Sequence, residues 1–399
     1  MDLRFTSEEI AFRDEVRKFF QGAPPQDIRR KCFFGQRLSR EDIVRWQHIL
    51  YEQGWATPRW PSEWGGTGWS AVKQYIFQEE TFLAPAPEPL TFNVNMIGPV
   101  LIAFGTEEQK KHFLPRIACL DYWFCQGFSE SEAGSDLASL RTQAHREGDQ
   151  YIINGQKLWT TMGHHANWCF LLVRTDPTAK KQQGITYLLM DMTSPGVTVR
   201  PIVSIDGNHE FNQLFMDNVR VPVANRIGDE NRGWDYAKYL LSHERTGVAR
   251  VGLCKFRVER AKALARNIAV GDRPLSEDTH FRERIALLEV ELKALEILQL
   301  RAIADNTHVE AGKPDPMAPI LKIRGSELQQ ATTELLLELA GYEAMEFDVD
   351  FLRGGARASD DKDWALTIAP NHYWLRHTTI SAGTNEIQRN ILAKTVLGL

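Results

Sequence analysis

Hydrophobic residues near the start of the chain recur at the spacing of an α-helix. Phe12, Val16 and Phe19 would lie on one face of such a helix. Thr6 and Glu9, three residues apart, have the pattern of a capping box at its beginning. Similar amphipathic stretches follow at residues 31–54, 71–83 and 106–120. The first part of the chain, residues 1–121, is therefore predicted to be an α-helical domain.

The hydrophobic pattern changes from about residue 122 onward to that of short β-strands. Asn154-Gly155 is typical of a two-residue hairpin turn. Regular spacing of the apolar runs favours a small β-sandwich or barrel over βαβ units, and we expect a central β domain at residues 122–233. The runs, separated by Gly, Pro and Asp, lie at residues 151–153, 157–159, 168–175, 185–192, 197–205 and 213–221.

Beyond Gly233 the strand pattern disappears and helical spacing returns. Ile285, Leu288 and Leu292 lie on one helix face, and the stretch from Leu328 to Leu339 repeats the pattern. Such stripes are typical of core-facing positions in a bundle. A C-terminal four-helix-bundle domain is predicted at residues 234–399. The predicted fold class is thus α+β and multidomain, with helices, a β domain and a helical bundle in that order.

Composition narrows the classes of function. The 399 residues are 43% hydrophobic and 25% charged, which is ordinary for a globular protein. A net charge of −5 argues against a nucleic-acid-binding protein, which needs a basic surface. No apolar run reaches the roughly 18 residues of a membrane span, and the five cysteines show no metal-ligand spacing. We therefore expect a soluble cytoplasmic protein that binds neither a membrane nor a metal.

The first candidate for chemistry is the peptide from Ser129 to Leu137. Its small residues Ala133 and Gly134 leave backbone N–H groups accessible to an anionic or carbonyl-bearing ligand. Ser129, Glu130 and Ser135 add side chains that form hydrogen bonds. Taken alone, a peptide of this kind is more often an ordinary surface turn.

Two further peptides change this interpretation. One is Lys157-Leu158-Trp159-Thr160-Thr161, and the other is Ala-Gly-Thr-Asn-Glu-Ile-Gln-Arg at residues 382–389. Together with residues 129–137, and in this order, they resemble the flavin site of the acyl-CoA dehydrogenase family. The resemblance covers essentially the whole chain. It implies FAD as the cofactor and the family's fold of N-terminal helices, a β domain and a C-terminal bundle.

The resemblance also implies roles for individual residues. Ser129 matches a hydroxyl that hydrogen-bonds the flavin ring, and Trp159 and Thr161 match a Trp-x-Thr pair that packs on the ring and bonds near N5 and O4. Gly134 and Ser135 occupy positions that contact the flavin and the CoA thioester. Without its neighbours, Trp159 would be interpreted as a packed strand tryptophan. The other implied cofactor-binding residues are Gln126, Phe128, Thr384 and Glu386.

The catalytic base departs from one common pattern of the family. Some members carry a glutamate directly before the Gly-Thr of the C-terminal peptide, where this chain has Ala382, which cannot accept a proton. A second branch carries its glutamate before an arginine on a bundle helix, and the matching residue here is Glu244. His243 is a rival base by its ordinary pKa, but successive helix residues point about 100° apart, so one of the two should face the flavin. A simpler alternative for Glu244 and Arg245 is a surface ion pair.

Two more residues are assigned to the substrate by the same resemblance. Arg245 is expected to hold the thioester end of CoA. The backbone N–H of Ala382 is expected to polarise the thioester carbonyl, a role that survives the change of side chain. Thr384 is expected to cap the following helix, whose N-terminus would favour the flavin pyrophosphate.

The adenine half of the flavin site looks less complete than the ring half. Many homo-oligomeric members have an Arg-x-x-Phe pair and a Gln-x-x-Gly-Gly motif, and neither is intact at residues 268–273 or 338–342. Either the chain is a divergent homo-oligomer or a homologous sister subunit supplies the missing contacts in an α2β2 assembly. The chain most resembles large subunits of two-component acyl-CoA dehydrogenases of the pimeloyl-CoA type, which favours the second alternative.

The resemblance implies oxidation of an acyl-CoA thioester to the trans-2-enoyl-CoA. Glu244 would take the α-proton and flavin N5 the β-hydride, and an electron-transfer flavoprotein would receive the electrons. Two alternatives stay open: an acyl-CoA oxidase that uses oxygen, and a non-catalytic subunit that completes a partner's flavin site. The acyl group is open as well, since a dicarboxylyl, branched, long-chain or steroid group would each agree with the sequence.

Overall fold

The structure is a computed structural model that describes residues 4–243, 249–305, 317–356 and 362–399. The chain separates into two compact units. A helical unit contains Met1–Trp46, Trp69–Glu88 and Arg245–Leu399, and a β unit contains Gln47–Gly68 and Pro89–Glu244. The division into three domains at residues 121 and 233 stays a prediction.

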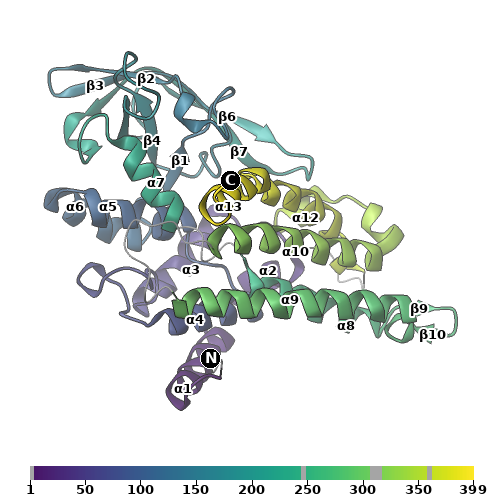
Figure 1. The fold of residues 1–399 in the computed structure, drawn as a ribbon. Helices are drawn as coiled ribbons and strands as arrows, with labels where there is room; N and C mark the ends of the chain where they lie inside the picture. The colour runs from purple at the N-terminus through teal and green to yellow at the C-terminus, as the bar shows by residue number, and fades with distance from the viewer. Residues whose placement is uncertain (1–3, 244–248, 306–316, 357–361) are drawn as a thin grey trace. The chain divides into compact units, whose positions relative to one another are not determined.

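The helical unit begins as the sequence predicts. Thr6 caps α1, because its Oγ1 accepts from Glu9 N at 3.2 Å while Thr6 N donates to a Glu9 carboxylate oxygen at 2.7 Å. The single stretch expected at residues 31–54 is instead two helices, because Gly35 adopts a left-handed conformation (φ +73°) that ends α2. Figure 1 shows the helices of this unit: α1 (Ser7–Gly22), α2 (Gln26–Phe34), most of α3 (Arg40–Glu52), α4 (Ala71–Leu83), α8 (Val251–Ala265), α9 (Thr279–Asp305), α10 (Met317–Ala340), α11 (Val349–Leu352), α12 (Ile368–Trp374) and α13 (Asn385–Thr395).

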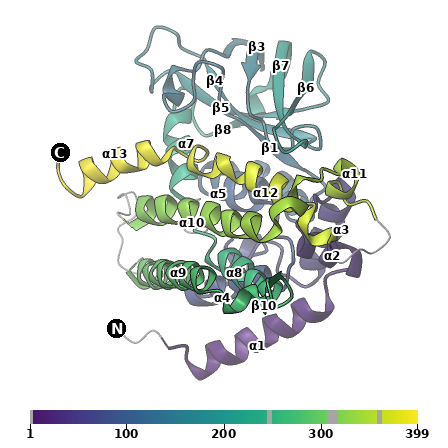
Figure 2. The same cartoon turned by 90° about the vertical axis from the view of Figure 1, so that its right-hand side faces the viewer.

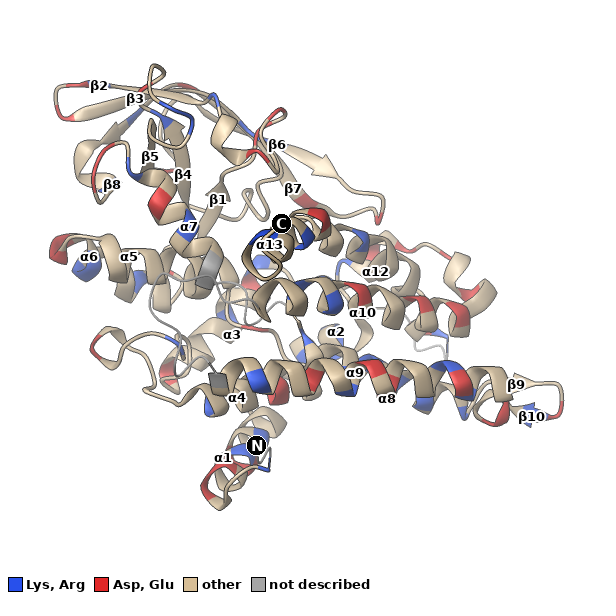
Figure 3. Cartoon of the chain, in the orientation of Figure 1, with Lys and Arg blue, Asp and Glu red and all other residues tan. Residues whose placement is uncertain are grey.

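Helix α10 is the centre of this unit and packs against α8, α9, α12 and α13 (Figure 2). The predicted leucine stripes are confirmed as core, since Leu292 on α9 and Leu328 and Leu335 on α10 are buried in one cluster. Gly325 lets α10 approach the start of α8, because a Cβ there would lie 2.5 Å from the Cα of Ala249. Charged residues of both signs are spread along α9 (Figure 3), which is typical of a solvated helix face.

The β unit is built around one sheet, and the β1 strand lies parallel to β4. The strands follow the order β6-β7-β3-β2-β4-β5-β8. Helices α5 (Gly98–Phe104), α6 (Glu107–Ala118) and α7 (Gly233–His243) belong to the same unit, with a π-helical segment at Phe92–Ile97. The bounds of the strands are β1 (Phe124–Gly127), β2 (Gln143–Glu147), β3 (Gln150–Lys157), β4 (Trp168–Arg174), β5 (Ile185–Asp191), β6 (Val197–Val203), β7 (His209–Pro222) and β8 (Arg226–Ile227).

The hairpin turn predicted at Asn154-Gly155 is wrong. Both residues lie inside β3, where the pairing with β7 is irregular between Ile153 and Gly155. Gly155 has φ +147°, and a Cβ there would meet Thr142 at 2.8 Å. The turn lies instead at Gly148 (φ +62°) and the residue after it, between β2 and β3. A glycine that permits a bulge and one that permits a turn look alike in sequence.

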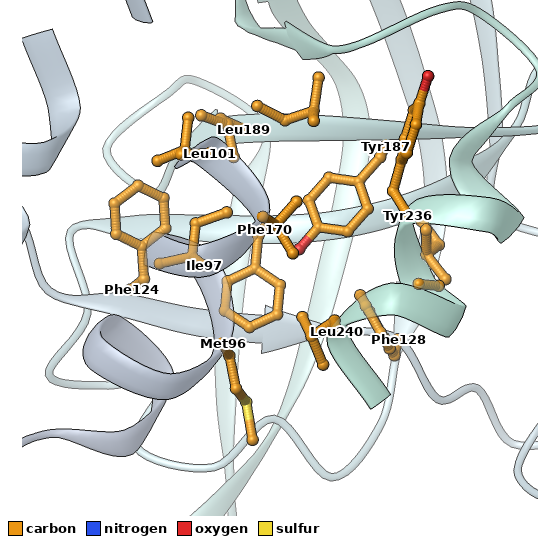
Figure 4. Close-up of a cluster of buried hydrophobic side chains, with 14 of the residues drawn as sticks. Met96, Ile97, Leu101, Phe124, Phe128, Phe170, Tyr187, Leu189, Tyr236 and Leu240 are labelled. Atoms are coloured by element: carbon orange, nitrogen blue, oxygen red, sulfur yellow. The ribbon is translucent and has the colours of Figure 1, made fainter. Parts of the chain in front are cut away.

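Two hydrophobic clusters cover the sheet. One joins strands to α5, α6 and α7, and Figure 4 shows Phe128, Phe170 and Tyr187 within it. The rings of Phe170 and Tyr187 are nearly parallel, at 8° and 6.2 Å, and Phe128 meets both edge-on. The second cluster contains residues of β1, β3, β4, β5 and β7. Because both clusters pack against β1, the chain leaves the end of this strand from a fixed position.

Candidate active site

The peptide that follows β1 forms a compact loop. Glu130 and Ala133 exchange backbone hydrogen bonds, both at 3.1 Å, which closes the turn between them. Gly134 and Ser135 are exposed, and no heavy atom lies within 4 Å of where a Cβ at Gly134 would stand. The hydroxyl groups of Ser129 and Ser135 make no hydrogen bond to the described part of the chain. The loop therefore presents open backbone and available hydroxyl groups.

A buried ion pair joins this loop to strand β3. Lys157 is 1% exposed, and its Nζ lies 2.7 Å from Glu130 Oε1 and 3.2 Å from the carbonyl oxygen of Phe128. The Glu130 carboxylate also accepts from the backbone N–H groups of Arg141 and Thr142, at 2.7 and 3.0 Å. Charged groups removed from water need such partners. The pair thus holds the loop after β1 against the end of β3.

Burial and pairing act in opposite directions on these two groups. Burial alone would raise the pKa of the Glu130 carboxyl, but Lys157 and the hydrogen bonds from Thr142 and Arg141 lower the pKa below its ordinary value. Burial lowers the pKa of Lys157, and Glu130 opposes this change. The Glu130 carboxyl is therefore ionised near neutral pH, and acid would neutralise it.

The peptide after β3 makes a strained corner. Leu158 N donates to Ser129 O at 2.8 Å, and Thr160 N donates to Asn212 O at 3.0 Å. Between them Trp159 has φ +61°, a left-handed conformation that bulky residues rarely adopt. The residue is 54% exposed, and its ring meets Phe211 edge-on at 5.6 Å. A tryptophan that only filled a strand interior would be buried, so the corner presents this ring outward.

The donors near this corner suit a planar heteroaromatic ligand. The Thr161 hydroxyl makes no hydrogen bond to the described residues, as is true of Ser129. The backbone hydrogen bond from Leu158 N to Ser129 O links the peptide after β3 directly to the peptide after β1. A flavin ring needs hydrogen-bonding groups at its polar edge and a large apolar wall. The exposed indole of Trp159 and the two free hydroxyls provide these types of group.

Two predicted cofactor residues lie on β1 and beside it. Gln126 is partly buried within β1. Phe128 is 5% exposed and its ring belongs to the core shown in Figure 4. Any contact of Phe128 with a cofactor would therefore come from its backbone, whose carbonyl already accepts from Lys157.

The C-terminal peptide lies in the helical unit. Ala382 (φ +55°) and Gly383 (φ +81°) form a left-handed turn before α13. Thr384 caps that helix as predicted, since its Oγ1 accepts from Ile387 N at 3.2 Å. Glu386 is exposed in the first turn. The predicted base Glu244 and its neighbour Arg245 lie outside the described residues.

A buried lysine supports the head of α13. Lys322 on α10 donates from Nζ to Asn385 Oδ1 at 2.8 Å, and Asn385 Nδ2 donates to Ser326 Oγ at 3.1 Å. Burial lowers the pKa of Lys322 to about 8, with Glu386 opposing and Arg389 reinforcing the change. These contacts fix the start of α13 behind the Ala382–Thr384 turn.

Models of three domains match the chain. They are the acyl-CoA dehydrogenase N-terminal domain at residues 6–120, the middle domain at 125–219 and the C-terminal domain at 231–397. The chain belongs to the acyl-CoA dehydrogenase family. It is therefore an oxidoreductase that acts on acyl-CoA, and its family is flavin-dependent.

Relatives within this family match along most or all of the chain. Acyl-CoA dehydrogenase IpdE1 of Mycobacterium tuberculosis is 36% identical over 90% of this chain and 88% of its own length. Acyl-CoA dehydrogenase FadE29 of the same organism is 37% identical over 100% and 98%. Among solved structures, the ChsE4-ChsE5 complex from Mycobacterium tuberculosis has a TM-score of 0.85 at 32% identity, covering 100% of this chain and 99% of the matched chain.

A second solved structure is similar to the same degree. The Tcur3481-Tcur3483 steroid ACAD has a TM-score of 0.85 at 31% identity, again covering 100% of this chain and 99% of the matched chain. The predicted family and fold class are thereby confirmed. Among the described residues, no helix is long and apolar enough to cross a membrane.

Sequence reasoning missed three residues that support the candidate peptides, each within its own unit. Lys157 was part of a recognised peptide, but nothing in the sequence indicates that it pairs with Glu130, 27 positions away. Asn212 and Lys322 were not singled out at all. The one signal in the sequence was the position of Lys157 within a predicted strand. A lysine that faces the core there implies an oppositely charged partner, because an unpaired charge is rarely buried.

Proposed function

We propose that this acyl-CoA dehydrogenase uses FAD to convert an acyl-CoA thioester to the trans-2-enoyl-CoA. The observation that carries the proposal is the exposed, left-handed Trp159 together with the hydroxyls of Ser129 and Thr161, which have no hydrogen-bond partner among the described residues. The Glu130–Lys157 pair holds the two peptides that supply these groups. A bound flavin supplies the hydride acceptor for oxidation of the Cα–Cβ bond.

Residues of both peptides would hold this cofactor and the thioester. Trp159 provides an apolar wall that excludes water, and Ser129 and Thr161 donate hydrogen bonds to the polar edge of the ring. Gly134 and Ser135, both exposed, would make the backbone and hydroxyl contacts to flavin and thioester. Gln126, Phe128, Thr384 and Glu386 complete the proposed cofactor set, with Phe128 acting through its backbone.

The proposed base is Glu244, which takes the α-proton of the thioester. Ala382 has no group that could do so, and its backbone N–H instead donates to the thioester carbonyl, which stabilises negative charge as the proton leaves. Arg245 holds the thioester end of CoA. Its positive charge lowers the pKa of a neighbouring carboxyl, against the rise that burial would produce.

A homologous sister subunit is the proposed partner. The ChsE4-ChsE5 complex and Tcur3481-Tcur3483 are assemblies of two different chains, and this chain matches 99% of one chain in each. The two adenine-side motifs that homo-oligomeric members carry are not intact at residues 268–273 and 338–342. An α2β2 assembly would supply these contacts, and an electron-transfer flavoprotein is the proposed acceptor.

An acyl-CoA panel tests this function. The chain, alone and with its sister subunit, is incubated with dicarboxylyl, branched, long-chain and steroid-side-chain acyl-CoA thioesters and an artificial electron acceptor. We expect one class to yield a product two hydrogen atoms lighter by mass spectrometry, in amounts that depend on the acceptor. Turnover with oxygen alone would indicate an oxidase instead. Failure of every thioester in a flavin-loaded preparation would favour the non-catalytic subunit.

A further inference from the structure

Asn212 on β7 holds Thr160 from both sides of its peptide. Its backbone carbonyl accepts from Thr160 N at 3.0 Å, and its side-chain Nδ2 donates to Thr160 O at 2.9 Å. Asn212 is fully buried. Thr160 lies between Trp159 and Thr161, the two residues proposed to meet the flavin ring. Asn212 therefore helps to position both of these residues.

The Thr160 carbonyl fixes the orientation of the Asn212 amide, and two histidines complete the hydrogen bonds of that amide. The carbonyl oxygen of Thr160 can only accept, so the amide nitrogen of Asn212 must face it. Asn212 Oδ1 then accepts from His209 Nε2 at 2.7 Å, and Nδ2 also donates to His164 Nδ1 at 3.2 Å. The network thus requires a proton on His209 Nε2 and none on His164 Nδ1.

The surroundings of His164 favour its neutral form. Its ring lies 3.9 Å from the rings of both His165 and His209, and it is nearly parallel to the latter at 25°. Burial, followed by the charges of His165 and His209, lowers the pKa of His164 to about 4. The carboxylate of Glu210, which follows His209 on β7, accepts from Asn208 Nδ2 at 3.2 Å.

We propose that Asn212 is a positioning residue for the Trp159–Thr161 corner, and that His164 makes its hold dependent on pH. The inference rests on the proposed flavin site. A protonated His164 presents an N–H to the Asn212 amino group, so the hydrogen bond between them is lost. The amide can then rotate away from Thr160, and the strained Trp159 conformation loses its support.

The direction of the pH effect follows from the neutral form required by the fold. The contribution of His164 to stability is fully present above about pH 6.5, the ordinary pKa of histidine. It decreases as the pH falls, and it is lost as the pH passes through the lowered pKa of about 4. Flavin retention is therefore expected to weaken toward pH 4.

The test replaces Asn212 by Asp, which keeps the shape but removes the donor to Thr160. We expect the affinity for FAD, measured by flavin fluorescence in the preparation that retains flavin, to fall about tenfold or more, because a buried acceptor loses its partner. Asn218→Asp is the matched control, since Asn218 lies exposed on the same strand and bonds Asn154 rather than the corner. Its affinity for FAD should stay within about twofold.

A second variant keeps the inference testable if Asn212→Asp does not fold. His164→Gln retains an acceptor for Asn212 but cannot titrate, so its flavin retention should no longer weaken toward pH 4. A pH profile equal to that of the unsubstituted protein would overturn the role of His164. Equal FAD affinity in the unsubstituted protein and Asn212→Asp would overturn the positioning role of Asn212 but leave the proposed function standing. An unsubstituted protein that binds no FAD, with or without its sister subunit, would overturn the proposed function as well.

Discussion

Replacing Glu244 by Gln is expected to lower the rate of acyl-CoA oxidation about 100- to 10,000-fold, the usual contribution of a positioned general base. Glutamine keeps the size of the side chain and its hydrogen bonds but cannot accept the α-proton. Flavin content should be unchanged, because the residues proposed to hold the ring lie elsewhere. Rapid mixing with substrate in the absence of oxygen measures the rate of flavin reduction directly.

His243→Gln is the control for this variant. His243 is the rival base and directly precedes Glu244, so the two variants introduce the same residue at adjacent positions. Its flavin reduction rate should stay within about threefold of the unsubstituted enzyme. If His243→Gln removed the activity and Glu244→Gln did not, the base would be the histidine.

Replacing Lys157 by Met is expected to lower the free energy of unfolding by about 3–5 kcal/mol, because it leaves the Glu130 carboxylate buried without its partner. Methionine preserves most of the buried volume, so the loss reports the charge rather than a cavity. Urea unfolding of the protein, monitored by tryptophan fluorescence, measures the change in the free energy of unfolding. Adding Glu130→Gln to this variant should recover much of the lost stability, since the double variant no longer has the unpaired charge.

Lys181→Met is the matched control. Lys181 pairs with Asp136 at the same 2.7 Å, but both side chains are more than half exposed. Such pairs contribute about 0–1 kcal/mol. Equal destabilisation by the two lysine variants would refute the claim that the buried pair holds the loop.

Because the pKa of Glu130 is lowered, the contribution of its pair with Lys157 to stability is present above about pH 4.5 and is lost as the pH falls further.

The parts of the fold that local pattern controls were predictable. The Thr6–Glu9 capping box, the leucine stripes of α9 and α10 and the runs that became β4 to β7 are all present. Each depends on residues within one element, where spacing alone determines which side chains share a face. The hairpin at Asn154-Gly155 failed for the opposite reason. Whether a glycine turns the chain or bulges a strand depends on what lies across the sheet, here Thr142.

The candidate site also combines local features that the sequence shows with long-range contacts that it does not. The peptides containing Ser129, Trp159 and Thr384 were identifiable by resemblance, and the cap at Thr384 followed from the sequence. What holds them is long-range: Lys157 meets Glu130, and Asn212 meets Thr160 from 52 positions away. Pairing of polar residues across such distances leaves no periodic pattern, so only the folded chain reveals it.

One measurement tests the central claim most directly. The protein, prepared with its sister subunit and loaded with FAD, is mixed with the acyl-CoA that gives the lighter product, in the absence of oxygen. We predict loss of the visible absorbance of oxidised flavin in the unsubstituted protein, at a rate at least about 100-fold above that of Glu244→Gln. A flavin that stays oxidised with every acyl-CoA, or is reduced equally fast in both proteins, would contradict the account.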